Sequence, residues 1–137
     1  MTAVVEVIKD PFLSVDGTDI SDQVSEIQLN FALDEIESTA SGDSCHVYVP
    51  GLEKPTASAK MFKNYGAGSV DELLWNTRGQ LVPFVMRRKR AAKGVSNPEF
   101  TFEGFMGQIP LISGAVGTAE ELTINIGINT PITRSTS

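Results

Sequence analysis

Two segments with a strict two-residue alternation limit the possible folds of this chain more than any other feature. In residues 26–33, EIQLNFAL, every second residue is apolar, and the intervening positions begin with Glu26, Gln28 and Asn30. Residues 122–128, LTINIGI, alternate in the same way. A β-strand points successive side chains to opposite faces of its sheet, so this period predicts strands that are buried on one face and solvated on the other.

Weaker alternation predicts several more strands. Residues 57–65, 81–90 and 99–109 are rich in strand-favouring residues and are bounded by Gly, Pro or Asn. Residues 4–8 and 12–15 add a candidate edge strand, which a tight turn in VDGTD follows. We therefore expect six or seven strands.

A single segment is predicted to be helical. Ser69 is a favourable N-cap, Glu72 stands where a capping-box partner belongs, and Gly79 is a natural C-terminal stop. These signals indicate a helix of about ten residues, an ordinary length. Its large apolar residues are expected to pack over an open end of the sheet: Leu73, Leu74 and Trp75.

The size and composition fit one globular domain. The chain has 137 residues, of which 41% are hydrophobic and 20% are charged, so it can bury a core without disulfides. Together with the strand and helix signals, this predicts a mainly β fold: a β-barrel or β-sandwich of six to seven strands with one flanking α-helix.

Like charges are gathered in blocks along the sequence. Residues 1–53 hold eleven acidic residues and one lysine, whereas residues 54–93 hold nine basic residues and two acidic ones. When two protein surfaces carry complementary electrostatic potentials, those potentials fix the register and orientation in which the surfaces bind. Self-assembly of the chain is therefore a candidate function.

Residues that carry catalysis or bind metals are scarce. Cys45 and His46 are the only residues of their types, and as neighbours in a strand they would point to opposite faces. Asp16, Asp19 and Asp22 lack the alternate-position acids, central glycine and closing glutamate of a calcium loop. We expect no enzymatic activity, no metal site and no cofactor.

The basic run Arg87, Arg88, Lys89 and Arg90 invites a nucleic-acid interpretation. No aromatic residue is interleaved with it for base stacking, and the chain has a net charge of -6. Direct binding to DNA or RNA is therefore disfavoured, and the run is expected to form a solvated or subunit-contacting strand edge.

Two segments have no sustained period. Residues 34–55 are rich in acidic and small polar residues, and a long excursion of this kind is usually functional or bound to a partner. Residues 130–137 are polar, and we expect them to be mobile in the isolated chain. Two interpretations stay open: a tail that is always disordered, or one that orders on a neighbouring copy during assembly.

The order of the segments carries a family resemblance. From the amino terminus they read DGTDISDQVSEIQLNFALDEIE, STASGD, VYVPGLEKPTASAKMFKNY, GSVDELLWNTRG, QLVPFVMRRKR, SNPEFTFEGFMGQIP and GAVGTAEELTINIGI. This ordered set resembles the major tail tube proteins of bacteriophages with long flexible tails, the siphophage-like group. The resemblance implies one tail tube domain over residues 1–137, with a stacking loop at about 34–55 and a flexible C-terminal arm at about 130–137.

The resemblance also implies a function. Six copies would form a ring, and rings would stack into the virion's tail tube, the conduit for DNA ejection. The implied partners are other copies of the chain and the tape measure, tail terminator and tail tip proteins. Assembly would take place in the host cytoplasm, with no membrane involved, and DNA would pass through the lumen without specific binding.

Specific residues follow from that resemblance. The polar face of residues 26–33 would line the lumen through Glu26, Gln28 and Asn30, and its acidity would repel DNA. Opposite sides of a contact between subunits or rings would carry Asp34, Glu35, Glu37 and Asp43 on the acidic side and Arg87, Arg88, Lys89 and Arg90 on the basic side.

Two alternatives stay open at this point. One is a ring or tube protein of a contractile tail or a secretion system, which would share the fold. The other is a small β-sandwich binding module, for which a cluster of exposed aromatic residues would be expected.

Overall fold

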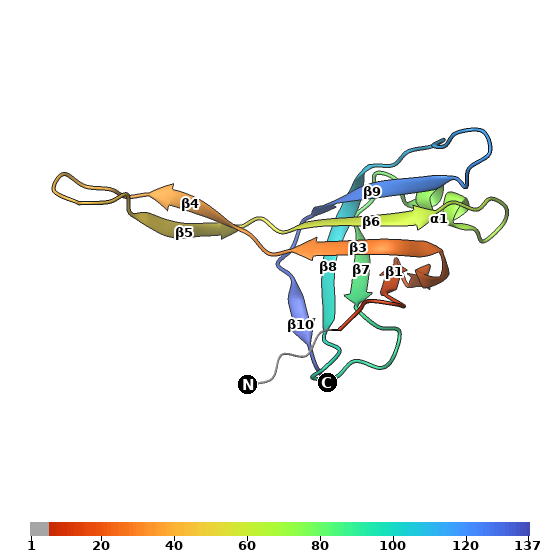
Figure 1. Cartoon of the computed structure of the whole chain (residues 1–137), viewed down its shortest axis with the longest axis horizontal. Coiled ribbons are helices and arrows are strands. Elements are labelled where there is room, and N and C mark those ends of the chain that lie inside the picture. Colours follow the sequence, from red (N-terminus) through yellow and green to blue (C-terminus); the bar gives the residue numbers. More distant parts are fainter. Residues whose placement is uncertain (1–5) are drawn as a thin grey trace.

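The alternating segments form an antiparallel sheet in the computed structural model, which describes residues 6–137 (Figure 1). Within these residues there are ten strands, one short 3-10 helix at Ser21–Gln23 and one α-helix. The elements are β1 (Phe12–Val15), β2 (Thr18–Asp19), β3 (Val24–Asn30), β4 (Leu33–Glu37), β5 (Tyr48–Glu53), β6 (Thr56–Phe62), α1 (Val70–Thr77), β7 (Val82–Arg87), β8 (Glu99–Gln108), β9 (Glu121–Ile128) and β10 (Thr133–Ser135).

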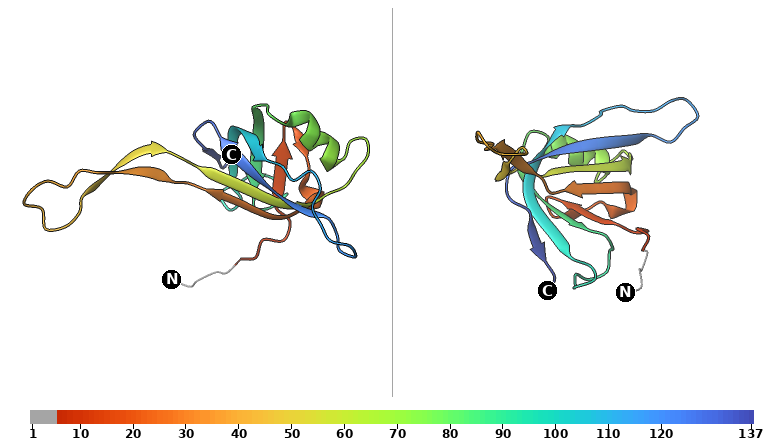
Figure 2. Two further views of the ribbon diagram at one scale, coloured as in Figure 1. Left: turned by 90° about the horizontal axis from the view of Figure 1, so that it is seen from above. Right: turned by 60° about the vertical axis from the view of Figure 1, so that its left-hand side comes forward.

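The main sheet curls into two layers that share strand β8. Its strand order is β2-β1-β7-β8-β9-β6-β3, and β10 also pairs with β8. Strands β3, β6 and β9 run across β1, β7 and β10, as Figures 1 and 2 show. Gly104 in the middle of β8 pairs with Val82 of β7 and with Ile128 of β9, so it marks the passage from one layer to the other.

The core lies between the two layers and under α1. The alternation in β9 buries Leu122, Ile124 and Ile126, as their spacing predicts. Across from them, the rings of Phe84 and Phe102 stack with centroids 5.3 Å apart. Ile27 and Leu29 of β3 pack only partly against this core: they belong to the edge strand of the sheet. The core is therefore built mainly from the inner side chains of β6, β7, β8 and β9.

Helix α1 begins where the capping signals predict. The Ser69 hydroxyl accepts a hydrogen bond from the Glu72 backbone N–H at 3.3 Å, and the Glu72 carboxylate accepts one from the Gly68 N–H at 3.0 Å. Gly79 has a φ of +72°, which favours glycine just beyond the helix. The helix is two residues shorter than the expected length of about ten.

The apolar residues of α1 do not all face the sheet. Leu74 is buried, and Leu73 packs partly against the core. Trp75 is 50% exposed, and its ring lies 3.7 Å from the guanidinium carbon of Arg78. The expectation that Trp75 covers the end of the sheet is therefore wrong, because it lies one position around the helix from Leu74 and faces solvent.

The structure also departs from the sequence prediction outside the main sheet. Residues 34–55, which have no sustained period and are expected to form a loop, form most of a hairpin of β4 and β5 that extends from the body (Figure 1). Residues 133–135, expected to lie in a mobile arm, pair with β8 as β10. Of the candidate strand at 4–8, residues 6–8 are not in a strand, and residues 4–5 lie outside the described part.

Candidate assembly surfaces

Polar residues cover most of the outer face of β3, β6 and β9. Glu26, Gln28 and Asn30 stand opposite Lys60, Ser58 and Thr56 of β6. Those three residues stand opposite Thr123, Asn125 and Gly127 of β9, so all nine share one face of the sheet. We call them the polar face.

This region of the sheet carries a small net negative charge. Lys60 lies between Glu26, its cross-strand partner, and Glu121, whose carboxylate is 3.2 Å from the Lys60 ammonium. Glu103 is also exposed, on the neighbouring strand β8. Three carboxylates therefore accompany one ammonium. The other side chains of the polar face are hydroxyls and amides, and two exposed aromatic rings, Phe62 of β6 and Phe105 of β8, lie at its margin. Such a surface is hydrated and has little affinity for phosphate groups.

Two strand edges beside the polar face have no partner strand within residues 6–137. Strand β3 is the last strand of the sheet, so one of its edges is open. Strand β7 pairs with β8 only from Phe100 to Gly104, whereas β9 pairs with the other edge of β8 as far as Gln108. The edge of residues 105–108 that faces away from β9 is therefore also open. Open edges are templates for pairing with another chain.

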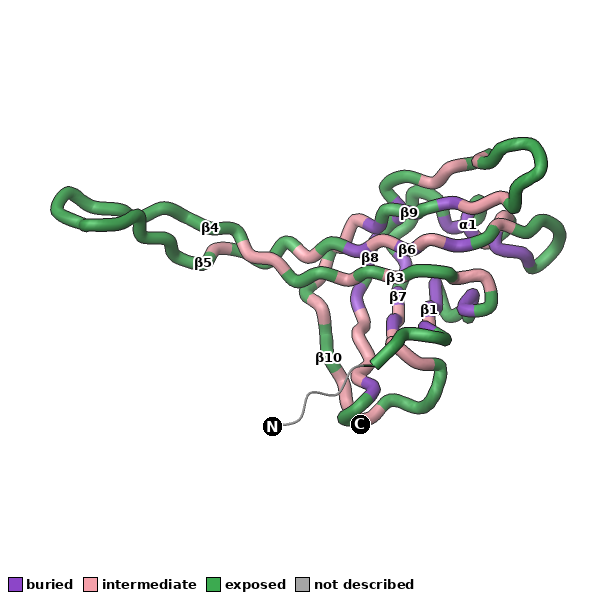
Figure 3. Tube along the Cα trace, viewed as in Figure 1, coloured by how far each residue is buried: buried purple, intermediate pink, exposed green. Residues whose placement is uncertain are grey.

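Strands β4 and β5 form an exposed arm, defined here as residues 33–53. Within the chain these two strands contact mainly each other, and Figure 3 shows that most of the arm is exposed. Ile36 and Leu52 are 53% and 81% exposed. A two-stranded ribbon in water is only marginally stable without further packing. The arm therefore gains little stability from packing within its own chain.

The arm holds the four acidic residues that the sequence singled out: Asp34, Glu35, Glu37 and Asp43. Asp34 pairs with Lys54 at the root of the arm at 3.2 Å, and Glu37 contacts the Nδ1 atom of His46 at 2.8 Å. Glu35 forms no ion pair with any residue that the structure describes. His46 and Cys45 lie in the exposed turn, outside any strand.

The basic run is largely neutralised inside its own chain. Arg87 pairs with Glu99 at 2.7 Å, with only 14% and 17% of the two side chains exposed, and stacks on the Phe12 ring at 3.9 Å. Arg88 pairs with Glu6, and Arg90 pairs with Asp22 at 2.8 Å. Lys89 forms no ion pair within residues 6–137. The run and the acidic arm do not meet in one chain, so any contact between them joins different copies.

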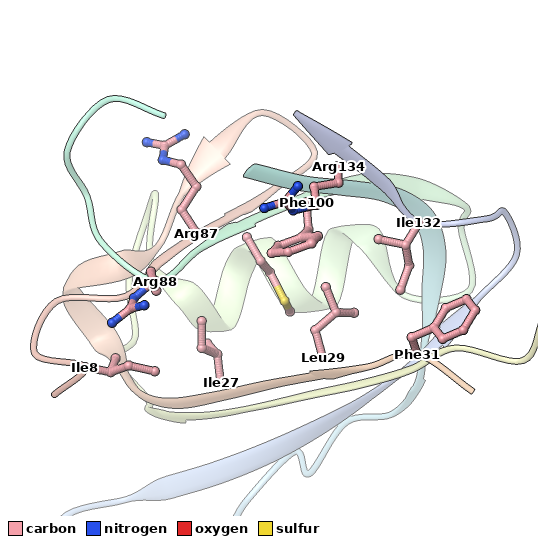
Figure 4. Close-up of a pocket in the computed structure, with 10 residues that line it drawn as sticks. Ile8, Ile27, Leu29, Phe31, Arg87, Arg88, Phe100, Ile132 and Arg134 are labelled. Atoms are coloured by element: carbon pink, nitrogen blue, oxygen red, sulfur yellow. The ribbon is translucent and has the colours of Figure 1, made fainter. Parts of the chain in front are cut away.

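An apolar groove of about 530 Å³ opens between β3 and β10 (Figure 4). Ile27 and Leu29 of β3 form one wall, and Phe100 and Ile132 lie opposite them. Arg87, Arg88 and Arg134 also line the groove. No local sequence pattern indicates this groove, because its walls come from segments about 100 residues apart.

A second feature that the sequence did not reveal is a cluster around Lys63. The Lys63 side chain is 2% exposed; its ammonium lies 3.2 Å from Asp71 of α1, and it donates a hydrogen bond to the Leu111 carbonyl oxygen. The Tyr65 hydroxyl donates to Glu120 at 2.7 Å. This hydrogen bond raises the pKa of Tyr65 to about 12 and lowers the pKa of Glu120. The cluster fixes the β8–β9 loop, residues 109–120, against α1.

Nothing in the described residues suggests a metal centre. No group of three or more His, Cys, Asp or Glu side chains gathers within residues 6–137. Asp19 instead accepts hydrogen bonds from the backbone N–H and the hydroxyl of Ser21. Partial burial raises the pKa of Asp19, but the two hydrogen bonds from Ser21 and the positive charges of Arg90 and Arg87 together hold the pKa below its usual value. In the same part of the chain, no helix has the length and apolar character needed to cross a membrane.

No family model and no curated protein matches this sequence. Solved structures do match over nearly the whole chain. A chain of a native gene transfer agent virion aligns with a TM-score of 0.76 and 9% identity, over 96% of this chain and 99% of that chain. A chain of the SPP1 tail tube aligns with a TM-score of 0.73 and 9% identity, over 93% of this chain and 77% of that chain.

A third match comes from the tail of an empty gene transfer agent particle, which was refined with C6 symmetry. It has a TM-score of 0.71 and 10% identity, over 96% of this chain and 99% of that chain. At identities this low, the likeness concerns the fold. The mainly β fold with one flanking helix that the sequence predicts is therefore confirmed, and it is the fold of tail tube structures.

Proposed function

We propose that this chain is the structural subunit of a phage-type tail tube. Copies form rings, and the rings stack into a hollow tube that conducts DNA. The observation that carries the proposal is the polar face with an open strand edge on each side of it. The likeness to tail tube structures supports the same conclusion.

The two open edges are compatible with a closed ring. Strands β8, β9, β6 and β3 are each antiparallel to their neighbours, so β3 and β8 run in opposite directions. Rotation about a ring axis preserves this relation, and β3 of one copy is antiparallel to β8 of the next copy. Pairing these edges would join the sheets of the ring into one barrel and remove the two open edges beside the polar face.

The composition of the polar face suits a channel for DNA. Lined by Glu26, Gln28 and Asn30 with the hydroxyls and amides of β6 and β9, the lumen would be wet and weakly acidic. Phosphates bind to proteins chiefly through lysine and arginine with release of counterions, and Lys60 on this face is already paired with Glu121. DNA would slide along such a wall without being held.

The arm would join one ring to the next. It protrudes from the end of β3 and the start of β6, beyond the body of the molecule (Figure 2). A contact that uses different surfaces on the two partners, and that does not close on itself, generates an open polymer. Six copies in each ring would match the C6 symmetry of the gene transfer agent tail.

The remaining parts of the proposal follow from the same family resemblance. The tube would be assembled in the host cytoplasm and become part of the virion tail. Its further partners would be tape measure, tail terminator and tail tip proteins, and its role would be structural rather than enzymatic.

Size-exclusion chromatography and negative-stain electron microscopy of the concentrated protein test this function. The matched control replaces residues 34–52 by an Asn-Gly turn, since the root of the arm is already closed by the Lys54 N–H to Ala32 carbonyl hydrogen bond at 2.8 Å. We expect hollow tubes from the full chain and none from the control. A full chain that stays monomeric at every concentration, and also when mixed with tube fragments, would instead indicate a binding module.

A further inference from the structure

We propose that the groove between β3 and β10 is the seat of the arm from a second copy, with Arg134 as its main charged contact. This inference rests on the proposed function, because it specifies which surface a neighbouring copy offers to the arm. The sequence alone suggests the basic run at residues 87–90 as the partner of the acidic arm. In this proposal the basic partner is instead Arg134 of the groove.

Charge is the first argument for this occupant. The ion pairs of Arg87 with Glu99 and of Arg88 with Glu6 already neutralise two of the three arginines that line the groove. Arg134 forms no ion pair with the described residues, and it is exposed. The arm, by contrast, carries five acidic residues and no lysine or arginine. A groove with an uncompensated positive charge and an acidic arm are complementary surfaces.

The apolar surfaces also match. The groove is lined by aliphatic and aromatic side chains that stay accessible in the single chain, among them Leu29, Phe31 and Ile132. The arm exposes Ile36 and Leu52, neither of which packs on the body of its own chain. Docking would bury both sets, and burial of apolar surface is worth about 25 cal/mol for each Å².

The geometry requires that the arm come from another copy. In Figures 1 and 2 the arm leads away from the body, whereas the groove lies alongside β3 and β10. An arm and a groove that are separate in each copy make a head-to-tail contact, which continues from copy to copy.

A second candidate occupant of the groove is the exposed apolar β8–β9 loop of another copy. It exposes Leu111, Ile112 and Val116, but residues 109–119 carry no charge to complement Arg134. We therefore assign the groove to the arm. Cross-linking that involves the loop instead of the arm is a separate outcome of the test below.

Disulfide trapping in assembled protein tests the assignment. In a Cys45→Ser background, one preparation carries Ile36→Cys on the arm and another carries Ile132→Cys in the groove. The two are mixed, assembled and oxidised, so a disulfide dimer can only join different copies. The control replaces the groove variant by Asn76→Cys on α1, an exposed helix position. We expect the 36–132 dimer and no 36–76 dimer.

A charge exchange supplies an independent readout. Glu35 and Arg134 lack ion pairs within residues 6–137, so each can be reversed without breaking an internal bridge. We expect Arg134→Glu to raise the concentration needed for assembly about tenfold, the equivalent of ~1.4 kcal/mol per copy. Adding Glu35→Arg should restore most of the loss, and Arg78→Glu on the helix should have little effect.

Failure of this inference is distinguishable from failure of the proposed function. If the wild-type chain assembles into tubes but Ile36→Cys links to position 76, to a cysteine at Ile112 in the β8–β9 loop, or to neither, the groove assignment is overturned and the tube stands. If the wild-type chain forms no tubes at all, the proposed function itself is refuted.

Discussion

Gly104 and Gly127 give the sharpest test of how the sheet passes between its layers. A methyl group added at Gly104 would lie 2.4 Å from the carbonyl oxygen of Gly127, and real Cβ atoms essentially never come closer than 3.0 Å to such an atom. The neighbouring backbone would therefore have to move by about 0.6 Å, in strands whose pairing leaves little freedom. Gly104→Ala should strain the junction of β8 and β9.

Gly127→Ala is the matched control. Its added methyl group would meet the Phe105 ring at 2.7 Å, but that ring is 42% exposed and can rotate away. Neither glycine has a positive φ, so alanine suits both backbones, and a Gly→Ala change at such a position also stabilises the fold by roughly 0.4–1 kcal/mol, because the unfolded chain loses conformational freedom. For Gly127→Ala, these two effects should nearly cancel, to within about 0.5 kcal/mol.

For Gly104→Ala the strain dominates. Overpacking that moves backbone costs about 1–3 kcal/mol, so the net loss in the free energy of unfolding should be about 1–2 kcal/mol. With an m-value of about 2 kcal/mol per M, the urea midpoint should fall by roughly 0.5–1 M. Urea unfolding of the three proteins, followed by the fluorescence of Trp75 or by circular dichroism, measures both changes. Equal urea midpoints for the two variants, or a larger loss of stability in Gly127→Ala, would show that the backbone contact at Gly104 is not the tighter constraint.

Three further predictions concern single interactions. Glu99→Gln should lower the free energy of unfolding by about 2 kcal/mol, because it leaves the mostly buried Arg87 guanidinium without its carboxylate; an unchanged urea midpoint would contradict this. Ser69→Ala should lower the free energy of unfolding by about 1 kcal/mol, because it removes the N-cap of α1. Ser69→Asp should retain most of the capping stabilisation, and urea unfolding of both variants measures the difference. Tyr65→Phe should raise the pKa of Glu120 toward its ordinary value, since the hydrogen bond from Tyr65 is the main cause of its lowering. The ionised Glu120 stabilises the fold above the ordinary carboxyl pKa, and this stabilisation is lost as the pH falls through the lowered pKa. Tyr65→Phe should therefore make the free energy of unfolding depend less on pH in this range. NMR titration of both proteins measures the pKa of Glu120.

The sequence predicts best those elements that bury one face. Strand β9 alternates because its inner side chains enter the core, and α1 begins at Ser69 because the unpaired N–H groups of its first turn need acceptors. Both signals are local, so they can be read without knowing the rest of the fold.

The arm shows why alternation fails elsewhere. Neither face of this exposed ribbon enters a core, so apolar and polar residues need not alternate along its strands. Its acidic residues also have low strand propensity. Trp75 shows a related limit: the buried residues of α1 are Val70, Leu74 and Thr77, spaced as one helix face requires, and the neighbouring apolar side chain falls outside that face.

The candidate site was predictable only in part. The shared face of Glu26, Gln28 and Asn30 follows from spacing alone. The internal neutralisation of Arg87 by Glu99 and the groove near Arg134 depend on how distant segments meet, and no local pattern encodes such contacts. Charge blocks therefore indicated an assembly surface without indicating which charges remain available for it.

Helical reconstruction of the assembled polymer by cryo-electron microscopy would show directly which face lines the lumen. We expect a hollow tube of stacked rings in which the polar face of β3, β6 and β9 lines the lumen and β3 of each copy pairs with β8 of the next. A polymer with this face on its outer surface, or with β3 left open, would refute the proposed tube.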